Sequence, residues 1–370
     1  MSYFELILII SAGVYTLFSI LLIAGVIVRD KKCLDITPDV SIIIPARNEE
    51  KNLKRCLESL EKLNYPKEKL EIIIVNDHST DNTCKIAESF CERNGHFSLL
   101  NLSDHTEAEK GKISALKAGF SNTQGEIVLQ TDADCRVQPD WVNAMISRFK
   151  ENTGIVGGVT LIETKNKINA CFGYLQSLDW LYLIGVGAGA YRIGIPLSSF
   201  GNNIAIRRMA YSDAGGYEKI PFTFTEDFAI FRNIIKSGWK ASYSLENNSV
   251  VQSLSPENIK SFINQRLRWT AGGIKLAGMG VLLLLSAFIL HILVPAGLLL
   301  NDITGLSLKI FSLTFLLDLI FLSVLSLKTK RAGLLLIFPV FELYYYLYTT
   351  VLGLIFPFST TLSWKERKYD

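Results

Sequence analysis

Two hydrophobic patterns divide this chain: short apolar runs through its middle and long apolar runs at both ends. Short continuous apolar runs bounded by polar residues are typical of strands that are buried on both faces of a parallel sheet. The four runs that we predict to be such strands are Val40–Pro45, Leu70–Val75, Phe97–Leu102 and Glu126–Thr131.

Helical spacing fills the intervals between these runs. Leu53, Leu57 and Leu60 recur three and four positions apart, which places them on one helix face. The predicted helices are Glu49–Leu63, a stretch capped near Ser79 that runs to Arg93, Lys112–Phe120, Phe228–Lys236 and Pro256–Lys275. Strands that alternate with helices predict a mainly parallel, doubly wound α/β sheet, which binds its ligands beyond the carboxyl ends of the strands.

The long apolar runs are long enough to cross a bilayer. They are Phe4–Val28, Leu276–Leu300, Thr304–Leu327 and Ala332–Phe358. The predicted organisation is a transmembrane helix in 1–30, a soluble domain in 38–252, an amphipathic interfacial helix in 253–275, about three transmembrane segments in 276–358, and a basic tail in 359–370. Basic residues after the first run place the soluble domain in the cytoplasm, and we expect an integral protein of a bacterial inner membrane.

Charged residues complicate the prediction for the membrane segments in 276–358. Asp318 and Glu342 fall inside apolar runs, where an ionisable group indicates a functional site or an interhelical partner. Basic residues follow the third run and also end the chain, so a single crossing between them breaks the positive-inside rule. Either the rule fails at the tail, or the last segment, interrupted by Pro339, is a re-entrant hairpin.

Composition narrows the function classes. The chain is 49% hydrophobic with a net charge of only +3, which gives no indication of a nucleic-acid partner. The six cysteines are scattered and predict reduced thiols rather than a zinc site or a disulfide framework. The absence of a glycine-rich nucleotide loop in the sequence argues against a Rossmann dehydrogenase and a P-loop NTPase.

Two acids end the strand predicted at 126–131. Asp132 and Asp134 are spaced i, i+2, so both carboxylates point to one side of an extended backbone. Such oxygens suit Mg²⁺ or Mn²⁺, which usually bridges to substrate phosphates. The alternative is a solvated acidic turn. Two more polar clusters, 45–49 and 76–81, fall at the same predicted edge of the sheet.

Six motifs in order carry a family resemblance. They are SIIIPARNE at 41–49, VNDHSTD at 75–81, TDAD at 131–134, FGNNIAIRR at 200–208, TED at 225–227 and QRLRW at 265–269. Together they resemble family-2 glycosyltransferases, which have a GT-A fold, and in particular membrane-anchored members that glycosylate ceramide, carotenoids and other lipids. The resemblance covers residues 40–273.

This resemblance implies an inverting, metal-dependent hexosyltransferase that uses a UDP-sugar, with UDP-glucose as the expected donor and Mg²⁺ or Mn²⁺ as cofactor. Asp227 would be the general base, with Glu226 contacting the acceptor or holding the loop. Asp134 would bind the metal, and Asp132 the metal or the ribose. The alternative for Glu226 and Asp227 is a helix cap, because a helix begins there.

The donor side follows from the same resemblance. The residues expected to bind the nucleotide sugar are Pro45, Arg47, Glu49, Asp77, Lys112 and Asp132. Asp77 would contact uracil, with an Asx turn as its alternative. Arg47 and Glu49 have a surface ion pair as theirs, and Lys112 a solvated position. His78 stands where many members have glycine, which suggests a loop without positive φ.

The acceptor and diphosphate side would be formed by Asn202, Asn203, Gln265, Arg268 and Trp269. Gln265, Arg268 and Trp269 share one helix face, where an indole can stack on a sugar and a guanidinium can bind a diphosphate. Arg266 would contact phospholipid. The alternative is a helix that only lies on the membrane.

A second aromatic stretch, 167–191, is either an interfacial helix near the acceptor entrance or a core helix. Its glycines at 185, 187 and 189 suggest a flexible or closely packed break. Because four apolar segments form a narrow scaffold, we expect transfer of one sugar to a membrane lipid. The alternatives are a processive polysaccharide synthase and an inactive scaffold on a transferase fold.

Overall fold

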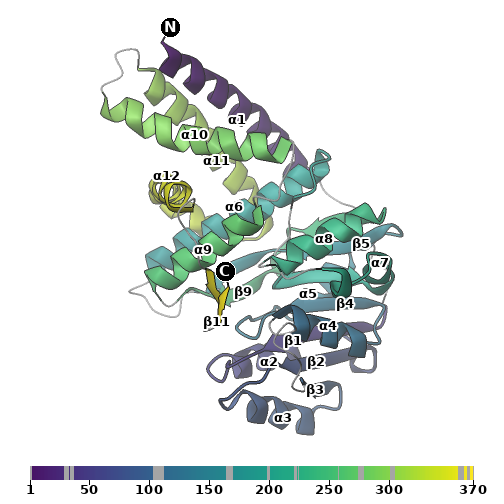
Figure 1. Cartoon of the computed structure of the whole chain (residues 1–370). Coiled ribbons are helices and arrows are strands. Elements are labelled where there is room, and N and C mark those ends of the chain that lie inside the picture. The colour runs from purple at the N-terminus through teal and green to yellow at the C-terminus, as the bar shows by residue number, and fades with distance from the viewer. Residues whose placement is uncertain are drawn as a thin grey trace.

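The structure is a computed structural model of the whole chain (Figure 1). It describes the chain except residues 1, 29–32, 34–36, 103–111, 164–169, 198–200, 221–222, 224, 257, 274–278, 301–304, 357–361, 365–366 and 370. Several residues on which the predictions above depend therefore lie outside the described residues. They are the basic residues 29, 31, 32 and 365, and Phe200, the first residue of the FGNN motif.

A seven-stranded sheet forms the centre of the soluble part, in the order β3-β2-β1-β4-β7-β5-β8. Its strands are β1 Val40–Ala46, β2 Leu70–Asn76, β3 Phe97–Asn101, β4 Ile127–Thr131, β5 Thr153–Gly158, β7 Asn203–Arg207 and β8 Lys240–Ser244. All four predicted strands are confirmed and run parallel to one another. Only β7 runs antiparallel, between β4 and β5, so the predicted mainly parallel α/β fold is confirmed.

Helices cover both faces of the sheet because neighbouring strand residues point to opposite sides. Ile42 and Ile44 belong to one core cluster and Ile43 to the other. The first face carries α2 Leu53–Glu61, α3 Thr83–Arg93 and α5 Trp141–Ile146. The second carries α4 Lys112–Asn122, α7 Arg208–Asp213 and α8 Glu226–Lys236. Short 3-10 turns connect elements of this part of the chain at Lys67–Lys69, Tyr217–Lys219 and Asn247–Ser249.

A long helix, α6 Ala170–Arg192, connects the sheet domain to the apolar helices. It contacts α1 Tyr3–Ile27, and also β6 Thr160–Glu163, which pairs with β9 Val251–Leu254. The helix runs without a break through its glycines. A Cβ atom on Gly25 of α1 would lie 2.8 Å from the carbonyl oxygen of Gly189. These glycines therefore serve close helix packing, and the expected break is wrong.

The apolar helices pack on and beside α6, away from the sheet (Figure 1). They are α1, α10 Met279–Leu299, α11 Leu306–Lys328, and α12 Phe338–Ile355 after a 3-10 turn at Ala332–Ile337. Among the described residues, three segments are long and apolar enough to cross a membrane: Tyr3–Ile27, Leu306–Lys328 and Ala332–Ile355. Within α10, residues 284–299 form a shorter apolar stretch.

Asp318 has the interhelical partners that the sequence suggested. It is buried in α11 and accepts hydrogen bonds from Tyr15 of α1 at 2.8 Å and Tyr182 of α6 at 3.1 Å. Glu342 of α12 is buried too. The contacts of Asp318 tie three helices together at one point, which accounts for a costly carboxyl group in an apolar helix.

The last helix differs from the expected hairpin. Figure 1 shows α12 almost along its axis, at a steep angle to α1 and α10. Pro339 stands in the first turn of one uninterrupted helix, a position that proline tolerates, so the hairpin interrupted at Pro339 is wrong. The tail forms a small hairpin of β10 Leu362–Trp364 and β11 Arg367–Tyr369, and β10 contacts α9 Ile259–Gly273.

Candidate active site

Three loops meet where β1, β2 and β4 end, at the same edge of the sheet. The register pairs Ala46 with Asn76, so the loops that follow β1 and β2 begin side by side. The Asp77 N–H donates to the Ala46 carbonyl at 2.8 Å. Arg47 Nη1 donates to the Asp77 carbonyl at 3.1 Å and lies 3.6 Å from its Oδ1. Arg47 thus connects two of the three predicted clusters.

Asp77 is 3% exposed, and its Oδ1 lies 2.9 Å from Nδ1 of His78. His78 has φ of +54°, in the left-handed region. The expectation of a loop without positive φ is therefore wrong. Histidine is one of the residues that enter this region more readily than most, so the loop keeps a glycine-like turn without a glycine.

The remaining polar residues of the first two clusters hold the loops. Asp81 Oδ1 accepts from the Thr83 N–H at 3.0 Å in the first turn of α3, and its Oδ2 accepts from the Glu50 N–H at 3.1 Å. The Glu49 carboxylate accepts from the Asn52 amide at 2.9 Å, next to the start of α2. Pro45 lies half-buried near the end of β1. Asp81 thus forms an Asx turn that leads into α3.

Lys112 connects the end of β4 with the start of α8. Its Nζ lies 2.8 Å from Asp132 Oδ1 and 3.4 Å from Glu226 Oε1. Burial alone would lower the pKa of Lys112, but these carboxylates and Asp227 outweigh burial and raise it. Lys112 is therefore a charged group inside the site and not a solvated lysine.

Asp134 lies two residues after Asp132 in the loop that follows β4, and it is half-buried. It accepts hydrogen bonds from the Ser253 hydroxyl at 3.4 Å and the Cys135 thiol at 3.3 Å, and its carbonyl accepts from Arg55 at 2.5 Å. No group of three or more His, Cys, Asp or Glu side chains forms a metal cluster among the described residues. Two carboxylates still fit Mg²⁺ or Mn²⁺, because such ions are commonly held by one or two carboxylates together with substrate phosphates.

Asp227 occupies the first turn of α8, beside the loop that contains Gly201 and Asn202. Its Oδ2 accepts a hydrogen bond from the Gly201 N–H at 2.9 Å. Burial and the neighbouring Glu226 raise the pKa of Asp227 to about 7, while Lys112 and the N–H groups of Phe228 and Gly201 oppose that rise. A carboxylate with this pKa is suited to accept a proton near neutral pH.

The two asparagines predicted on the acceptor side differ. Asn202 is almost buried, and its Oδ1 accepts from the Thr160 hydroxyl at 3.0 Å. Asn203 is fully buried at the start of β7. Its amide donates to two carbonyls, and its Oδ1 accepts from the Trp141 indole at 2.9 Å. Asn203 therefore has a structural role, because its side chain connects β7 to Trp141 and to two backbone carbonyls.

The helix of the QRLRW motif packs between α6 and α12. Trp269 forms an edge-to-face contact with Trp180 of α6, with ring centroids 5.1 Å apart. Arg266 is 2% exposed and forms an ion pair with Asp179 of α6, while its guanidinium lies 4.4 Å from the Trp269 ring centroid. The expected phospholipid contact of Arg266 is therefore wrong, because α6 covers the face of α9 that bears it.

Gln265 and Arg268, the other two predicted residues of this motif, are both half-buried. The buried Oε1 of Gln265 has no hydrogen-bond partner among the described residues. Three contact residues were not predicted from the sequence: Gly201 holds Asp227, Arg55 holds Asp134 and Asp179 holds Arg266. Asp179 alone had a readable signal, since it is the one acid within the apolar stretch 170–192.

A mainly parallel sheet with acids beyond β2 and β4, and a further acid at the start of α8, defines a transferase with a GT-A-type fold. The family model described as "Glycosyl transferase family 2" matches residues 41–172, and that described as "Glycosyl transferase family group 2" matches 127–359. The chain belongs to the family-2 glycosyltransferases.

Known relatives agree with this assignment. The chain is 29% identical over 240 residues to "Probable glycosyltransferase YdaM" of Bacillus subtilis, covering 64% of this chain and 55% of that protein. It is 29% identical over 237 residues to the poly-beta-1,6-N-acetyl-D-glucosamine synthase of Staphylococcus epidermidis, covering 63% and 54%. The chain thus spans about half the length of these relatives.

A solved structure shares the fold. The mannosyltransferase PcManGT from Pyrobaculum calidifontis, in complex with GDP-Man and Mn²⁺, aligns with a TM-score of 0.57 at 17% identity. The alignment covers 92% of this chain and 99% of that one. At 17% identity this similarity supports the shared fold alone, and the substrate and metal must be argued from the residues of the site.

Proposed function

We propose that the protein transfers a sugar from a UDP-sugar to an acceptor hydroxyl in one inverting displacement, with Asp227 as general base. The observation that carries the proposal is the environment of Asp227. Its carboxylate is held by the Gly201 N–H, and its pKa is raised to about 7. In the proposed step Asp227 removes the proton of the hydroxyl as its oxygen attacks the anomeric carbon, and the nucleoside diphosphate leaves.

The donor would lie along the carboxyl ends of β1, β2 and β4. Asp77 would contact the base, and the support for this is its nearly buried carboxylate between Arg47 and His78. Lys112 carries a positive charge beside Asp132 and would meet the diphosphate. Asp134, together with Asp132, would hold the Mg²⁺ or Mn²⁺ ion, which when bound neutralises charge on the diphosphate.

The acceptor would approach from α9. The unpartnered Oε1 of Gln265 among the described residues supports a hydrogen bond to an acceptor hydroxyl. The contact of α9 with α12 supports an acceptor that arrives at the membrane, because 332–355 is one of the segments long and apolar enough to cross it. The same segments support an integral membrane protein, and the basic residues after the first run support a cytoplasmic catalytic domain.

Two acceptors fit this arrangement. A growing polysaccharide is the first, because the Staphylococcus relative is a poly-beta-1,6-N-acetyl-D-glucosamine synthase. This relative favours N-acetylglucosamine as the transferred sugar over the glucose that we expected from the sequence. A single transfer to a membrane lipid is the second, favoured by the position of α9 against α12.

The test uses purified full-length protein with Mg²⁺ or Mn²⁺ and separate UDP-glucose and UDP-N-acetylglucosamine. We expect UDP release with one donor, and none from Asp227→Asn. Membrane lipid is then added and the mass of the product is measured by mass spectrometry. A series of products that differ by one sugar unit indicates a polymer, and a single added unit indicates lipid glycosylation. Absence of both binding and hydrolysis across a panel of UDP-sugars would refute the proposed donor class.

A further inference from the structure

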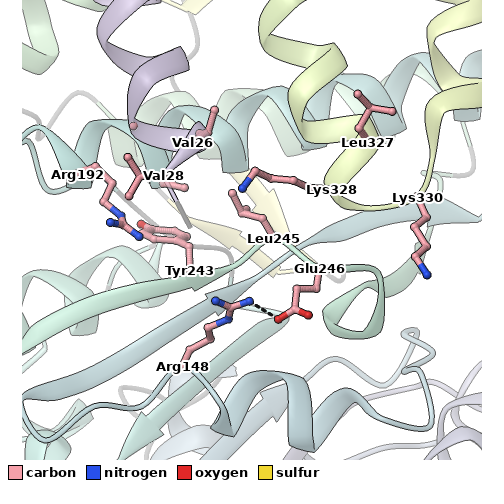
Figure 2. A pocket seen from close by; sticks show the side chains of 12 residues that line it. Val26, Val28, Arg148, Arg192, Tyr243, Leu245, Glu246, Leu327, Lys328 and Lys330 are labelled. Atoms are coloured by element: carbon pink, nitrogen blue, oxygen red, sulfur yellow. Dashed lines mark hydrogen bonds and ion pairs between the residues drawn. The ribbon is translucent and has the colours of Figure 1, made fainter. Parts of the chain in front are cut away.

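A basic cavity of about 350 Å³ lies far from the candidate active site, where three helices end against β8 (Figure 2). The helices are α1, α6 and α11, and each contributes residues from its last turn or just beyond it. β8 stands at one end of the sheet order, three places from β4. The cavity is therefore a separate feature from the loops that carry Asp77, Asp132 and Asp134.

The charge of the lining is strongly one-sided. Its basic residues are Arg148, Arg192, Lys328 and Lys330, and its one acid is Glu246. Arg148 forms an ion pair with Glu246, as Figure 2 shows. With four basic residues and one acid, the lining as a whole has a formal charge of +3. A cavity of this kind favours an anion with several acceptor oxygens, such as a phosphate group.

The cavity also has an apolar side. Val26 and Val28 come from the end of α1, and Leu327 from the end of α11. Val28 is 55% exposed and Leu327 is 67% exposed. Figure 2 shows Leu327 on the helix above Lys328. Apolar residues that are exposed beside a basic cavity match the two chemistries of a phospholipid, which joins a charged headgroup to acyl chains.

A simpler role for two of these side chains is to offset the partial negative charge of helix ends. Lys328 stands in the last turn of α11 and Arg192 in the last turn of α6. That role explains neither the cavity nor Lys330, which lies beyond the end of α11 and is exposed. A ligand with phosphate oxygens accounts for the cavity, for Lys330 and for the two basic side chains at the helix ends.

We propose that this cavity binds the phosphate headgroup of an anionic phospholipid from the leaflet that faces the catalytic domain. The proposal rests on the membrane placement given under Proposed function. With α1 and α11 across the bilayer, their carboxyl-terminal ends reach the cytoplasmic headgroup layer together. Basic pockets at that depth are typical sites for anionic lipid headgroups. The lipid would hold the sheet domain at a constant height above the membrane.

The test is native mass spectrometry of the full chain in detergent, with phosphatidylglycerol and phosphatidylcholine as probes. We expect the wild-type protein to retain phosphatidylglycerol in preference to phosphatidylcholine. The double variant Lys328→Gln/Lys330→Gln should weaken that binding by roughly 20- to 30-fold, since one lysine near an anionic surface contributes roughly a fivefold factor. The single variant Lys330→Gln changes an exposed side chain and should lose roughly fivefold without a change in folding.

Lys309→Gln is the matched control, because Lys309 is exposed in the first turn of the same helix and would meet the opposite leaflet. It should bind phosphatidylglycerol as wild type does. Equal binding of both lipids, equal losses in Lys309→Gln and Lys330→Gln, or displacement of the lipid by excess inorganic phosphate would each overturn the proposal. UDP-sugar binding, measured by thermal shift on the same samples, separates this outcome from failure of the proposed function.

Discussion

The Gly201 N–H donates a hydrogen bond of 2.9 Å to the carboxylate of Asp227. The two residues also leave no room for a side chain between them, since a Cβ added to Gly201 would lie 2.9 Å from the Asp227 Cβ. Gly201 therefore orients the proposed base in two ways: through a backbone donor, and by having no side chain. The hydrogen bond also favours the ionised carboxylate, which is the form that a base requires.

Gly201→Ala should lower the rate of transfer, because the new methyl group displaces the Asp227 carboxylate from its position. A displacement of about 1 Å from productive geometry costs on the order of 100-fold in rate. UDP affinity should stay near wild type. The control is Gly95→Ala, where an added Cβ meets nothing within 4 Å. Equal rates for the two variants would show that Gly201 does not position the base.

Asp227→Asn should abolish proton abstraction while keeping the shape of the side chain. General-base catalysis contributes roughly 100- to 10,000-fold, so transfer should fall by that order. Calorimetric titration with UDP should show nearly unchanged affinity. Loss of transfer and UDP binding together would instead indicate that Asp227 acts as a structural cap of α8.

The pH profile of kcat/KM should rise to a plateau above about 7, because Asp227 with a pKa of about 7 is protonated below that pH and cannot act as a base. Lys112→Met removes a positive neighbour that lowers the pKa of Asp227, so the rising limb should move to higher pH. Glu226→Gln removes a negative neighbour that raises it, so the limb should move to lower pH. Shifts in one common direction, or none, would contradict this assignment.

Asp134→Asn should raise the concentration of Mn²⁺ needed for half-maximal UDP binding, because an amide oxygen is a weaker ligand than a carboxylate. Chelation by EDTA should remove UDP-sugar binding from wild type, and added Mn²⁺ or Mg²⁺ should restore it. Titration calorimetry at several metal concentrations measures both effects. Tight UDP-sugar binding in EDTA would refute the metal assignment.

Arg266→Met should destabilise the protein, because it leaves Asp179 as an uncompensated charge between α6 and α9. Breaking a buried ion pair costs roughly 3–5 kcal/mol, whereas replacing both partners with apolar residues is often close to neutral. The double variant Asp179→Leu/Arg266→Met should therefore recover most of the thermal stability. If Arg266→Met has wild-type stability and binds lipid more weakly, the result would instead support the phospholipid contact that the sequence predicted.

The sequence by itself determined the first half of the sheet and the places of its acids. The strands at 40–46, 70–76 and 127–131 are continuous apolar runs that end in polar residues, and that information is local. Parallel strands then bring Asp77 and Asp132 to one edge, which is a general property of the fold. The strands after 131 were not predicted, because β7 joins the sheet antiparallel between strands that neighbour it only in space.

The tertiary structure alone decided how the charged side chains are used. Lys112 and Asp132 meet because α4 packs over β1 and β2, and β1 pairs with β4, a contact that neither local pattern contains. Arg266 looked exposed on an amphipathic helix, but α6 covers that face and supplies Asp179. Periodicity specifies which residues share a face of an element. Only packing between distant elements determines what that face meets, and so which charges are paired, buried or left for a ligand.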